Sequence, residues 1–173
     1  ARGRGLPIHA ETCPQYLFLS AEDLGIDPDD PMHGARCICS PPPRDKANQQ
    51  FIWNGLSSGL FTIVSSDHAP FNMNGSDGKR VAGDNASFDR IPNGIPGVET
   101  RLPLLMSEGV LKGRIDIHRF VELTATNPAR LYGLYPRKGT IAVGSDADFV
   151  VWDMFPEGQE KLLTNDMLHH DAD

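Results

Sequence analysis

The chain has 173 residues, of which 39% are apolar and 23% are charged, and its formal net charge at pH 7 is −7. This length and composition predict a soluble globular domain with one sizeable core rather than a disordered chain. The lysines and arginines are scattered, so nucleic acid is not an expected partner, because a phosphate backbone needs concentrated positive charge. No apolar run approaches the roughly 18 residues of a membrane-spanning helix, so insertion into a membrane is not expected either.

The cysteine content argues against a disulfide framework. Cys13, Cys37 and Cys39 are few and odd in number, and two of them would share one face of a strand. No second pair of cysteines or histidines follows at the spacing of a zinc knuckle. We therefore expect the cysteines to be buried small hydrophobic residues of a protein in a reducing cytoplasm.

The first half of the chain predicts a strand, a helix and a second strand. A short strand is expected over 6–12, a helical turn over 20–24 and a short extended piece over 36–39. Residues 44–59 have helical composition and spacing, and a glycine closes the segment. Residues 60–65, "LFTIVS", are β-branched and almost wholly apolar, as is typical of a parallel strand buried on both faces.

The second half predicts a long loop, helices and a small β unit. Residues 72–97 are rich in glycine, asparagine, aspartate and proline and show no periodicity, which favours a functional or mobile loop. Helices are expected over 100–108 and 117–132, with a bend or restart at the Asn-Pro pair at 127–128. Residues 139–153 predict two short strands around a tight turn. This order suggests the end of a parallel α/β array followed by the start of a β domain.

The two ends of the sequence suggest a fragment. There is no initiator methionine, "ARGRG" resembles the end of a helix, and "LLTNDMLHHDAD" contains no closing element. We therefore expect these 173 residues to be a piece of a longer protein.

The stretch "IVSSDHAPFN" places Asp67 at the carboxyl end of the second predicted strand, which is the end where α/β barrels build active sites. A carboxylate there can bind a cation through oxygen or accept a proton. An ordinary turn residue is the alternative and is the more frequent case for an isolated strand end. The neighbouring Ser65, Ser66 and His68, together with the long loop that follows, favour the functional interpretation. His68 itself could orient a carboxylate or a substrate, or be purely structural.

Two further positions have the chemistry to recognise an amide. Asn93, in the rigid loop "IPNGIPG", offers an amide donor and a carbonyl acceptor, the pair that a cyclic amide or imide needs. Ser40, before a run of three prolines, could contact a ligand through its hydroxyl or main chain. Taken alone, each is better explained as a plain turn or strand end.

Five long stretches, in this order, resemble one known family. They are "ETCPQYLFLS", "CSPPPRDKANQQFIWNGL", "SSDHAPF", "IPNGIPGVETRLPLL" and "ATNPARLYGLYPRKGTIAVGSDADFVVWD". Together they are similar to the carboxyl-terminal half of bacterial D-hydantoinases and dihydropyrimidinases, in the amidohydrolase superfamily. The resemblance covers nearly the whole chain.

The resemblance implies an α/β fold, namely the last two strands of a (β/α)₈ barrel, at 6–12 and 60–66, and the start of a flanking β-sandwich. The implied domains are 1–135 for the barrel portion and 136–173 for the sandwich portion. A complete barrel needs roughly 200–250 residues, so this chain cannot close one. The family's site holds two divalent metal ions, usually zinc, bridged by a carbamylated lysine, and Asp67 is the single ligand with a counterpart here.

The mechanism implied by the resemblance is hydrolysis of a hydantoin or 5,6-dihydropyrimidine ring to the N-carbamoyl amino acid. Asp67 would bind one metal, accept the proton of the attacking hydroxide and pass it to the leaving nitrogen. Ser40 and Asn93 match the positions that hold the amide edge of the substrate, largely through main-chain groups. The implied partners are a small cyclic amide or imide and, for the full-length protein, further copies of itself as a homotetramer or dimer. With one ligand of six, the 173 residues alone are expected to be inactive.

Two other interpretations stay open at this point. One is a different cyclic amidohydrolase, an allantoinase or dihydroorotase, because "SDHAP" is widespread in the superfamily. The other is a non-enzymatic scaffold protein related to dihydropyrimidinase, which would lack metal ligands. The presence of Asp67 favours the enzyme.

Overall fold

The computed structural model describes residues 2–25, 27–154, 161–169 and 172. Two parallel strands lie at its centre, β1 (Glu11–Thr12) and β2 (Ile63–Val64), with Glu11 opposite Ile63 and Thr12 opposite Val64. The predicted parallel α/β arrangement is therefore confirmed, but the strands are shorter than predicted. Leu6 and Ile8 are about half exposed, so the first part of the expected strand has no neighbour to pair with among the described residues.

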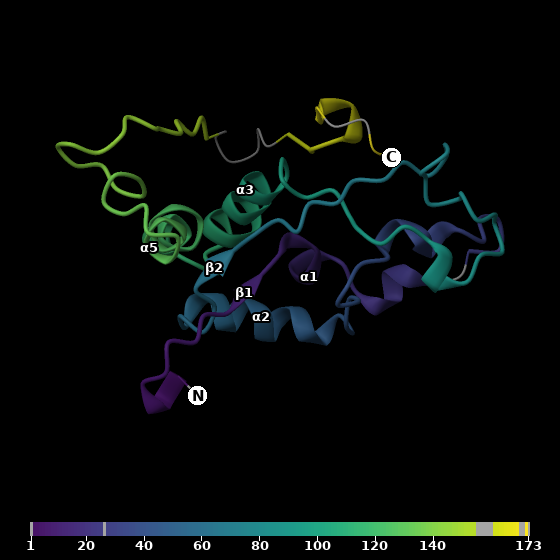
Figure 1. Cartoon of the computed structure of the whole chain (residues 1–173), viewed down its shortest axis with the longest axis horizontal. Coiled ribbons are helices and arrows are strands. Elements are labelled where there is room, and N and C mark those ends of the chain that lie inside the picture. Colours follow the sequence, from purple (N-terminus) through teal and green to yellow (C-terminus); the bar gives the residue numbers. More distant parts are fainter. Residues whose placement is uncertain (1, 26, 155–160, 170–171, 173) are drawn as a thin grey trace.

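The long connection between the strands includes α2 (Ala47–Ser57), which confirms the helix predicted over 44–59. Gly59 ends it with a φ of 82°, a left-handed conformation that suits glycine. Gly55 lets the helix approach the strand segment closely, because a Cβ there would lie 2.7 Å from the ring of Phe61. In Figure 1, β1 and β2 run side by side, with α2 on one side of them and α3 on the other.

The remaining helices are short, and several are not regular α-helices. The α-helices are α1 (Pro14–Phe18), α3 (Arg101–Leu104), α4 (Ile117–Val121) and α5 (Asn127–Leu131); π-helical turns cover Leu105–Leu111 and Glu122–Thr126; 3₁₀ turns cover Arg2–Arg4, Ala21–Leu24, His33–Cys37, Phe88–Arg90 and Asn165–Met167. The helical turn predicted over 20–24 and the helices predicted over 100–108 and 117–132 are confirmed. As predicted, α-helical bonding restarts at the Asn-Pro pair at 127–128.

The extended piece predicted over 36–39 is wrong in its first part, which belongs to a 3₁₀ turn. The turn packs Ala35 into a small apolar cluster with Met32, Met73 and Ile91. This contact joins distant parts of the chain, so the local sequence did not reveal it.

The main core lies between the strand pair and the helices. Its buried members are Leu17, Trp53, Leu56, Val64, Leu105, Met106, Ile115, Phe120 and Leu123. Cys13 and Cys39 are also buried and free, as predicted, whereas Cys37 is only half-buried. In the part of the chain that the structure describes, no helix has both the length and the apolar character to cross a membrane.

Side chains from distant segments bind the main chain at the amino end of β2. Arg2 donates to the carbonyls of Gly59 (2.9 Å) and Leu60 (2.8 Å). Arg119 donates to the carbonyls of Leu56 (2.7 Å) and Phe61 (2.6 Å). Asn127 donates to the carbonyl of Thr62 at 2.9 Å. The contacts at residues 59–62 satisfy carbonyl groups that the short strand leaves without a β-ladder partner, and the bond to Leu56 adds a donor near the end of α2.

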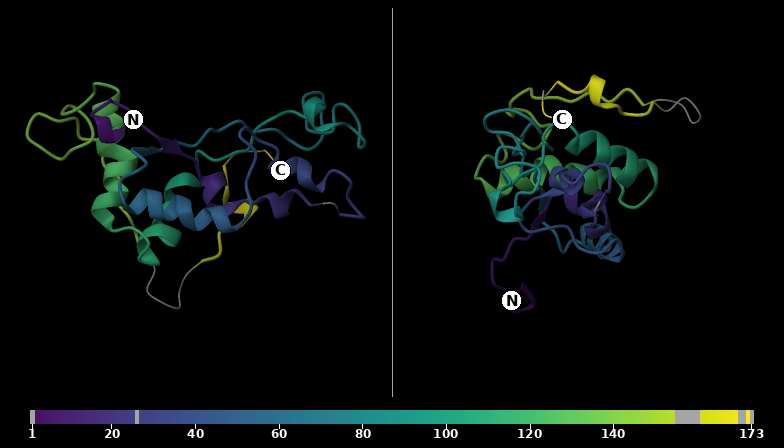
Figure 2. Two further views of the ribbon diagram at one scale, coloured as in Figure 1. Left: turned by 90° about the horizontal axis from the view of Figure 1, so that it is seen from below. Right: turned by 90° about the vertical axis from the view of Figure 1, so that its right-hand side faces the viewer.

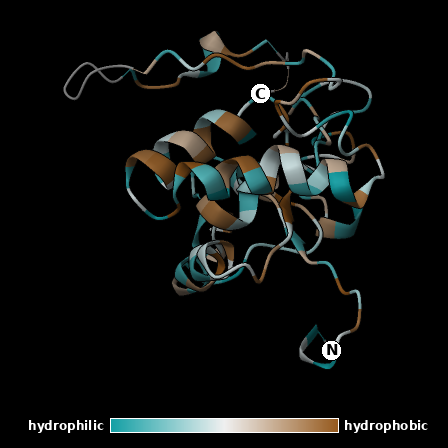
Figure 3. Ribbon diagram, turned by 90° about the vertical axis from the view of Figure 1, so that its left-hand side faces the viewer, coloured by the Kyte–Doolittle hydropathy of each residue, from teal (hydrophilic) through white to brown (hydrophobic). Residues whose placement is uncertain are grey.

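The two strands predicted within 139–153 are wrong for this structure. Only the turn forms, where the Ser145 N–H donates to the Ala142 carbonyl at 3.1 Å. Ile141 is 85% exposed and Val143 fully exposed, so no sheet formed by the described residues covers their apolar side chains. Figure 3 shows apolar ribbon both in the helices around the core and along the extended segment that lies apart from them. The pattern was that of a strand, but a strand needs a partner to form.

Loops gather at the carboxyl end of the strand pair. The predicted long loop over 72–97 is confirmed, apart from one 3₁₀ turn. Figure 1 and the left view of Figure 2 show this loop and the segment near 20–37 extending together from one end of the molecule, with α5 at the other end.

Candidate functional site

Asp67 follows β2 on the exposed side of the loop cluster. Its φ is 47°, the one described non-glycine residue with a positive φ, and aspartate is among the few residues that tolerate this conformation. The side chain receives one long hydrogen bond, from Gln15 Nε2 at 3.4 Å, and no cation pairs with it in the described ranges. Its carboxylate oxygens are therefore open for a ligand.

The loop that carries Asn93 is fixed directly beside Asp67. His68 Nδ1 accepts hydrogen bonds from the N–H groups of Gly97 at 3.0 Å and Val98 at 3.3 Å. Because Nδ1 accepts, the N–H of the neutral imidazole is on Nε2, and the ring holds the Asn93 loop against the loop after β2. The Ala69 N–H also donates to the carbonyl of Ile95 at 3.1 Å. Of the two roles considered for His68, the contacts support a structural one.

Gly94 is required by the same packing. Its φ is 153°, and a Cβ at this position would lie 2.4 Å from the Cβ of Ala69 and 2.6 Å from the Ala69 carbonyl oxygen. The loop after β2 and the loop of Asn93 are therefore in direct contact through a position that only glycine fits.

Ser40 and Asn93, 53 positions apart in the sequence, are in contact. Asn93 Nδ2 donates to Ser40 Oγ at 2.8 Å, and the Gly94 N–H donates to the Ile38 carbonyl at 3.0 Å. Both side chains are exposed. Two loops that looked unremarkable separately thus form one surface.

The main-chain groups of these two residues have a further property in common. Within the described residues, the N–H and the carbonyl of Ser40 and of Asn93 make no hydrogen bond. The side-chain contact between them therefore leaves two main-chain donors and two main-chain acceptors without a partner among the described residues.

Tyr16 of α1 binds the loop that carries Ser40. Its hydroxyl donates to the carbonyl of Pro41 at 3.0 Å. Burial is the largest cause that raises the pKa of this hydroxyl, and the negative charge of Asp67 adds to it, so Tyr16 is a neutral donor. Burial likewise raises the pKa of the Cys39 thiol. Cys39 is buried and the pKa of its thiol is raised, so we interpret this thiol as a packing group rather than a nucleophile.

The residues present fit one ligand of a metal centre. Asp67 supplies open carboxylate oxygens, the donor type that divalent cations accept. Among residues 2–25, 27–154, 161–169 and 172, no group of three or more histidine, cysteine, aspartate or glutamate side chains is arranged to hold a metal ion. A complete metal centre would need ligands beyond those of the described residues.

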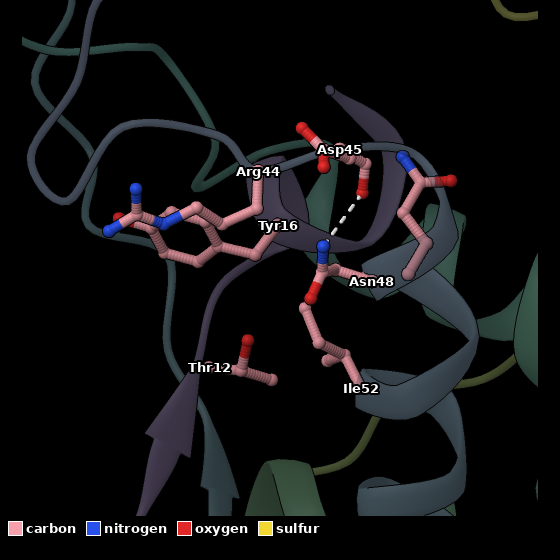
Figure 4. A pocket seen from close by; sticks show the side chains of 7 residues that line it. Thr12, Tyr16, Arg44, Asp45, Asn48 and Ile52 are labelled. Carbon is pink, nitrogen blue, oxygen red and sulfur yellow. Dashed lines mark hydrogen bonds between the residues drawn. The ribbon is translucent and has the colours of Figure 1, made fainter. Parts of the chain in front are cut away.

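A small pocket of about 90 Å³ lies beside the site but is separate from it. Figure 4 shows Tyr16 next to Arg44, and Asn48 of α2 donating to the carbonyl of Asp45 at 3.2 Å. None of Asp67, Ser40 and Asn93 lines this pocket. It is a gap between α1 and the first turn of α2, not the candidate site.

Two residues of this region have no sequence signal that identifies them. Tyr16 sits in a short helix, and Lys79 sits in a loop without periodicity, so their partners, Pro41, Pro92 and Gly94, become visible only in three dimensions. A buried lysine in a Gly-rich loop has no pattern that distinguishes it from an exposed one.

The chain is similar to known proteins along its length. It matches the Amidohydrolase family over residues 38–170. It is 48% identical over 157 residues to a D-hydantoinase of Streptomyces coelicolor, covering 91% of this chain and 32% of that protein. It is 46% identical over 173 residues to a D-hydantoinase of Rhizobium radiobacter, covering 100% of this chain and 35% of that protein.

The structure agrees with the sequence comparison. The crystal structure of a dihydropyrimidinase from Brevibacillus agri has a TM-score of 0.77 and 47% identity, and the match covers 85% of this chain and 30% of the other. The chain spans about a third of the length of the curated relatives that it matches. The resemblance to D-hydantoinases and dihydropyrimidinases is confirmed, and the chain belongs to the amidohydrolase family, whose members are metal-dependent.

Proposed function

We propose that these residues are the carboxyl-terminal part of a metal-dependent enzyme that opens a hydantoin or 5,6-dihydropyrimidine ring to the N-carbamoyl amino acid. In this proposal β1 and β2 are the last two strands of the barrel, residues 1–135 belong to that barrel, and 136–173 begin the β-sandwich. The parallel pairing of the two strands across α2 supports this placement. The named relatives support the reaction.

The observation that carries the proposal is the pairing of Ser40 with Asn93 beside Asp67. A ring such as hydantoin presents carbonyl and N–H groups along one edge, and it needs a matching acceptor and donor. The unpaired main-chain groups of Ser40 and Asn93 offer both. A buried polar group left unmatched costs about 1–3 kcal/mol, so this complementarity selects for an amide edge.

The chemical step assigned to this chain is a proton transfer at Asp67. Two divalent cations, proposed to be zinc ions bridged by a carbamylated lysine outside these residues, would supply Lewis acidity and make hydroxide available near neutral pH. Asp67 would hold one of these cations through its carboxylate. Attack of the hydroxide on the ring carbonyl carbon would form a C–O bond, and the Asp67 carboxylate would take the proton that the hydroxide gives up. It would deliver this proton to the ring nitrogen as the C–N bond breaks. Ser40 and Asn93 hold the ring so that the carbonyl faces this carboxylate.

A substrate panel tests the proposal. The protein in its full natural length is assayed with dihydrouracil, hydantoin, allantoin and dihydroorotate, and ring opening is followed by the N-carbamoyl product. We expect turnover of one of the first two, with two metal ions per protomer by elemental analysis and loss of activity after chelation. Preference for allantoin or dihydroorotate would instead assign the protein to a neighbouring cyclic amidohydrolase, and no turnover of any ring would support a scaffold protein.

The 173-residue chain by itself provides a second test. With Asp67 as its one proposed ligand, it is expected to retain no stoichiometric zinc after dialysis and to open none of the rings. The proposal also includes a cytoplasmic homo-oligomer, a dimer or tetramer, which sedimentation of the full-length protein would measure.

A further inference from the structure

Lys79 is a buried cation that the proposed chemistry does not use. It is 2% exposed, although lysine is almost never fully buried unless its ammonium is paired. Burial lowers the pKa of its ammonium, because a charge is less stable away from water. Such a costly position calls for a structural or functional reason.

The partners of the ammonium are two carbonyls that flank Asn93. Lys79 Nζ donates to the Pro92 carbonyl at 3.1 Å and to the Gly94 carbonyl at 2.9 Å. The ring of Phe71 lies 5.8 Å from Nζ, measured to its centroid. In the described part of the chain no carboxylate lies within 4 Å of Nζ. The charge is therefore balanced by carbonyl dipoles and a ring face, both of which hold a fixed direction.

The lysine is itself held in place by its main chain. The Lys79 N–H donates to the Asn72 carbonyl at 2.8 Å, and the Arg80 N–H donates to the Met73 carbonyl at 2.9 Å. Met73 belongs to the small apolar cluster and is 2% exposed. The backbone of Lys79 is thus held in place where its ammonium reaches the Asn93 loop.

The two peptide planes around Asn93 are fixed by different contacts. The Pro92 carbonyl and the Asn93 N–H share one planar trans peptide and point in opposite directions, so binding of the carbonyl by Lys79 turns the N–H away from the lysine. The Asn93 carbonyl and the Gly94 N–H share the next peptide, and the Gly94 N–H is bound to Ile38. Lys79 therefore fixes the direction of the Asn93 N–H, and the bond from Gly94 to Ile38 fixes the direction of the Asn93 carbonyl.

We propose that Lys79 is a positioning residue for substrate: its buried ammonium holds the Pro92 and Gly94 carbonyls and thereby aims the Asn93 N–H at the substrate's amide edge. The inference rests on the proposed function, in which Asn93 binds the ring. Lys79 touches no reacting atom, so its removal should weaken binding more than it slows the chemistry.

Substitutions in the full-length protein test this role. Lys79→Met keeps the length of the side chain but removes the charge and all donors, and we expect KM for the ring substrate to rise about 10-fold while kcat changes less than about 3-fold. Lys79→Gln, which keeps one amide donor group, should give an intermediate KM. Arg80→Met is the matched control. The Arg80 side chain pairs with Asp30 and Asp84 and not with residues 92–94, so KM should stay at the wild-type value.

Hydrogen exchange of the 91–98 peptide gives a readout that does not depend on turnover. We expect faster exchange in Lys79→Met than in the wild type and in Arg80→Met. A lower kcat with an unchanged KM would indicate only a smaller folded fraction and would overturn the proposal, as would an unchanged KM in folded Lys79→Met protein. If the wild type opens no ring, the proposed function fails, and exchange alone decides the loop contact: unchanged exchange overturns it and faster exchange supports it.

Discussion

The two ends of the β1–β2 pair are built in opposite ways. At the amino end, the carbonyls of residues 59–62 are bound by side chains from distant segments, namely Arg2, Arg119 and Asn127. At the carboxyl end, both main-chain and side-chain contacts join the loops, and the main-chain groups of Ser40 and Asn93 stay free of partners among the described residues.

This difference between the two ends suggests that the amino end serves the stability of the fold and that the carboxyl end serves ligand binding. A carbonyl that a side chain of the same protein binds contributes to folding and is less available to a ligand, whereas a free group held in a fixed direction costs stability and is available for binding. In barrel enzymes the carboxyl ends of the strands carry the chemistry and the opposite face carries stability. Substitutions at the two ends should therefore affect different measurements.

The largest effect is expected at Asp67. Asp67→Asn keeps a side chain that tolerates the positive φ but weakens the ligand and removes the proton acceptor. We expect kcat to fall about 10²–10⁴-fold, with the midpoint of thermal unfolding unchanged. Asp77→Asn, in the exposed part of the long loop, is the control and should keep full activity. A large loss of stability in Asp67→Asn would break the proposed separation.

The amino end should show the reverse pattern. Arg119→Ala leaves the Leu56 and Phe61 carbonyls without their charged donor, so the free energy of unfolding should fall by about 2–4 kcal/mol in denaturant titration. KM of the protein that remains folded should be unchanged. Arg130→Ala, which removes only an arginine over the exposed ring of Tyr135, should cost less than about 1 kcal/mol. A raised KM in Arg119→Ala would contradict the comparison.

Gly94→Ala tests a position where both properties should change. Its Cβ would meet the Ala69 Cβ at 2.4 Å, so the Asn93 loop must move away from the loop after β2. We expect a loss of about 1–3 kcal/mol in the free energy of unfolding and a higher KM. Gly83→Ala, where nothing lies within 4 Å of an added Cβ, carries only the backbone cost of its φ of 90° and should leave KM unchanged.

The smallest effect expected is a difference in acid sensitivity. Arg36 and Arg80 lower the pKa of Asp30, so these contacts stabilise the fold fully above the ordinary pKa of about 3.9 and are lost as pH falls through the lowered folded value. The hydrogen bonds at the amino end are accepted by carbonyl oxygens rather than by a carboxylate. Acid should therefore loosen the 78–84 peptide before the 57–62 peptide in hydrogen exchange corrected for intrinsic rates, and Asp30→Asn should remove that difference.

The sequence predicted the parts of the molecule that depend on local pattern. The apolar run before Asp67, the helix before Gly59 and the restart at the Asn-Pro pair at 127–128 each follow from residue type and spacing, and each is present. The strands predicted within 139–153 had an equally good pattern and did not form. Their side chains have no covering sheet in the described structure, and pairing is not a local property.

The candidate site was predictable only in outline. Residue chemistry and the family resemblance led to Asp67, Ser40 and Asn93, and the structure brings the last two into contact. Their supports, Tyr16 and Lys79, bind through carbonyls of residues far away in sequence, and carbonyl contacts leave no trace in side-chain patterns. Functional side chains can thus be recognised from sequence more readily than the groups that orient them.

The left-handed backbone of Asp67 has a consequence for protein engineering. Residues with a Cβ are less stable than glycine in this conformation, by about 1–2 kcal/mol for an ordinary residue. A library selected for thermal stability alone should therefore enrich glycine at position 67 and discard the carboxylate. Thermostabilisation of this protein would need a paired selection for turnover, because a gain in stability at position 67 would remove the carboxylate that the proposed reaction needs.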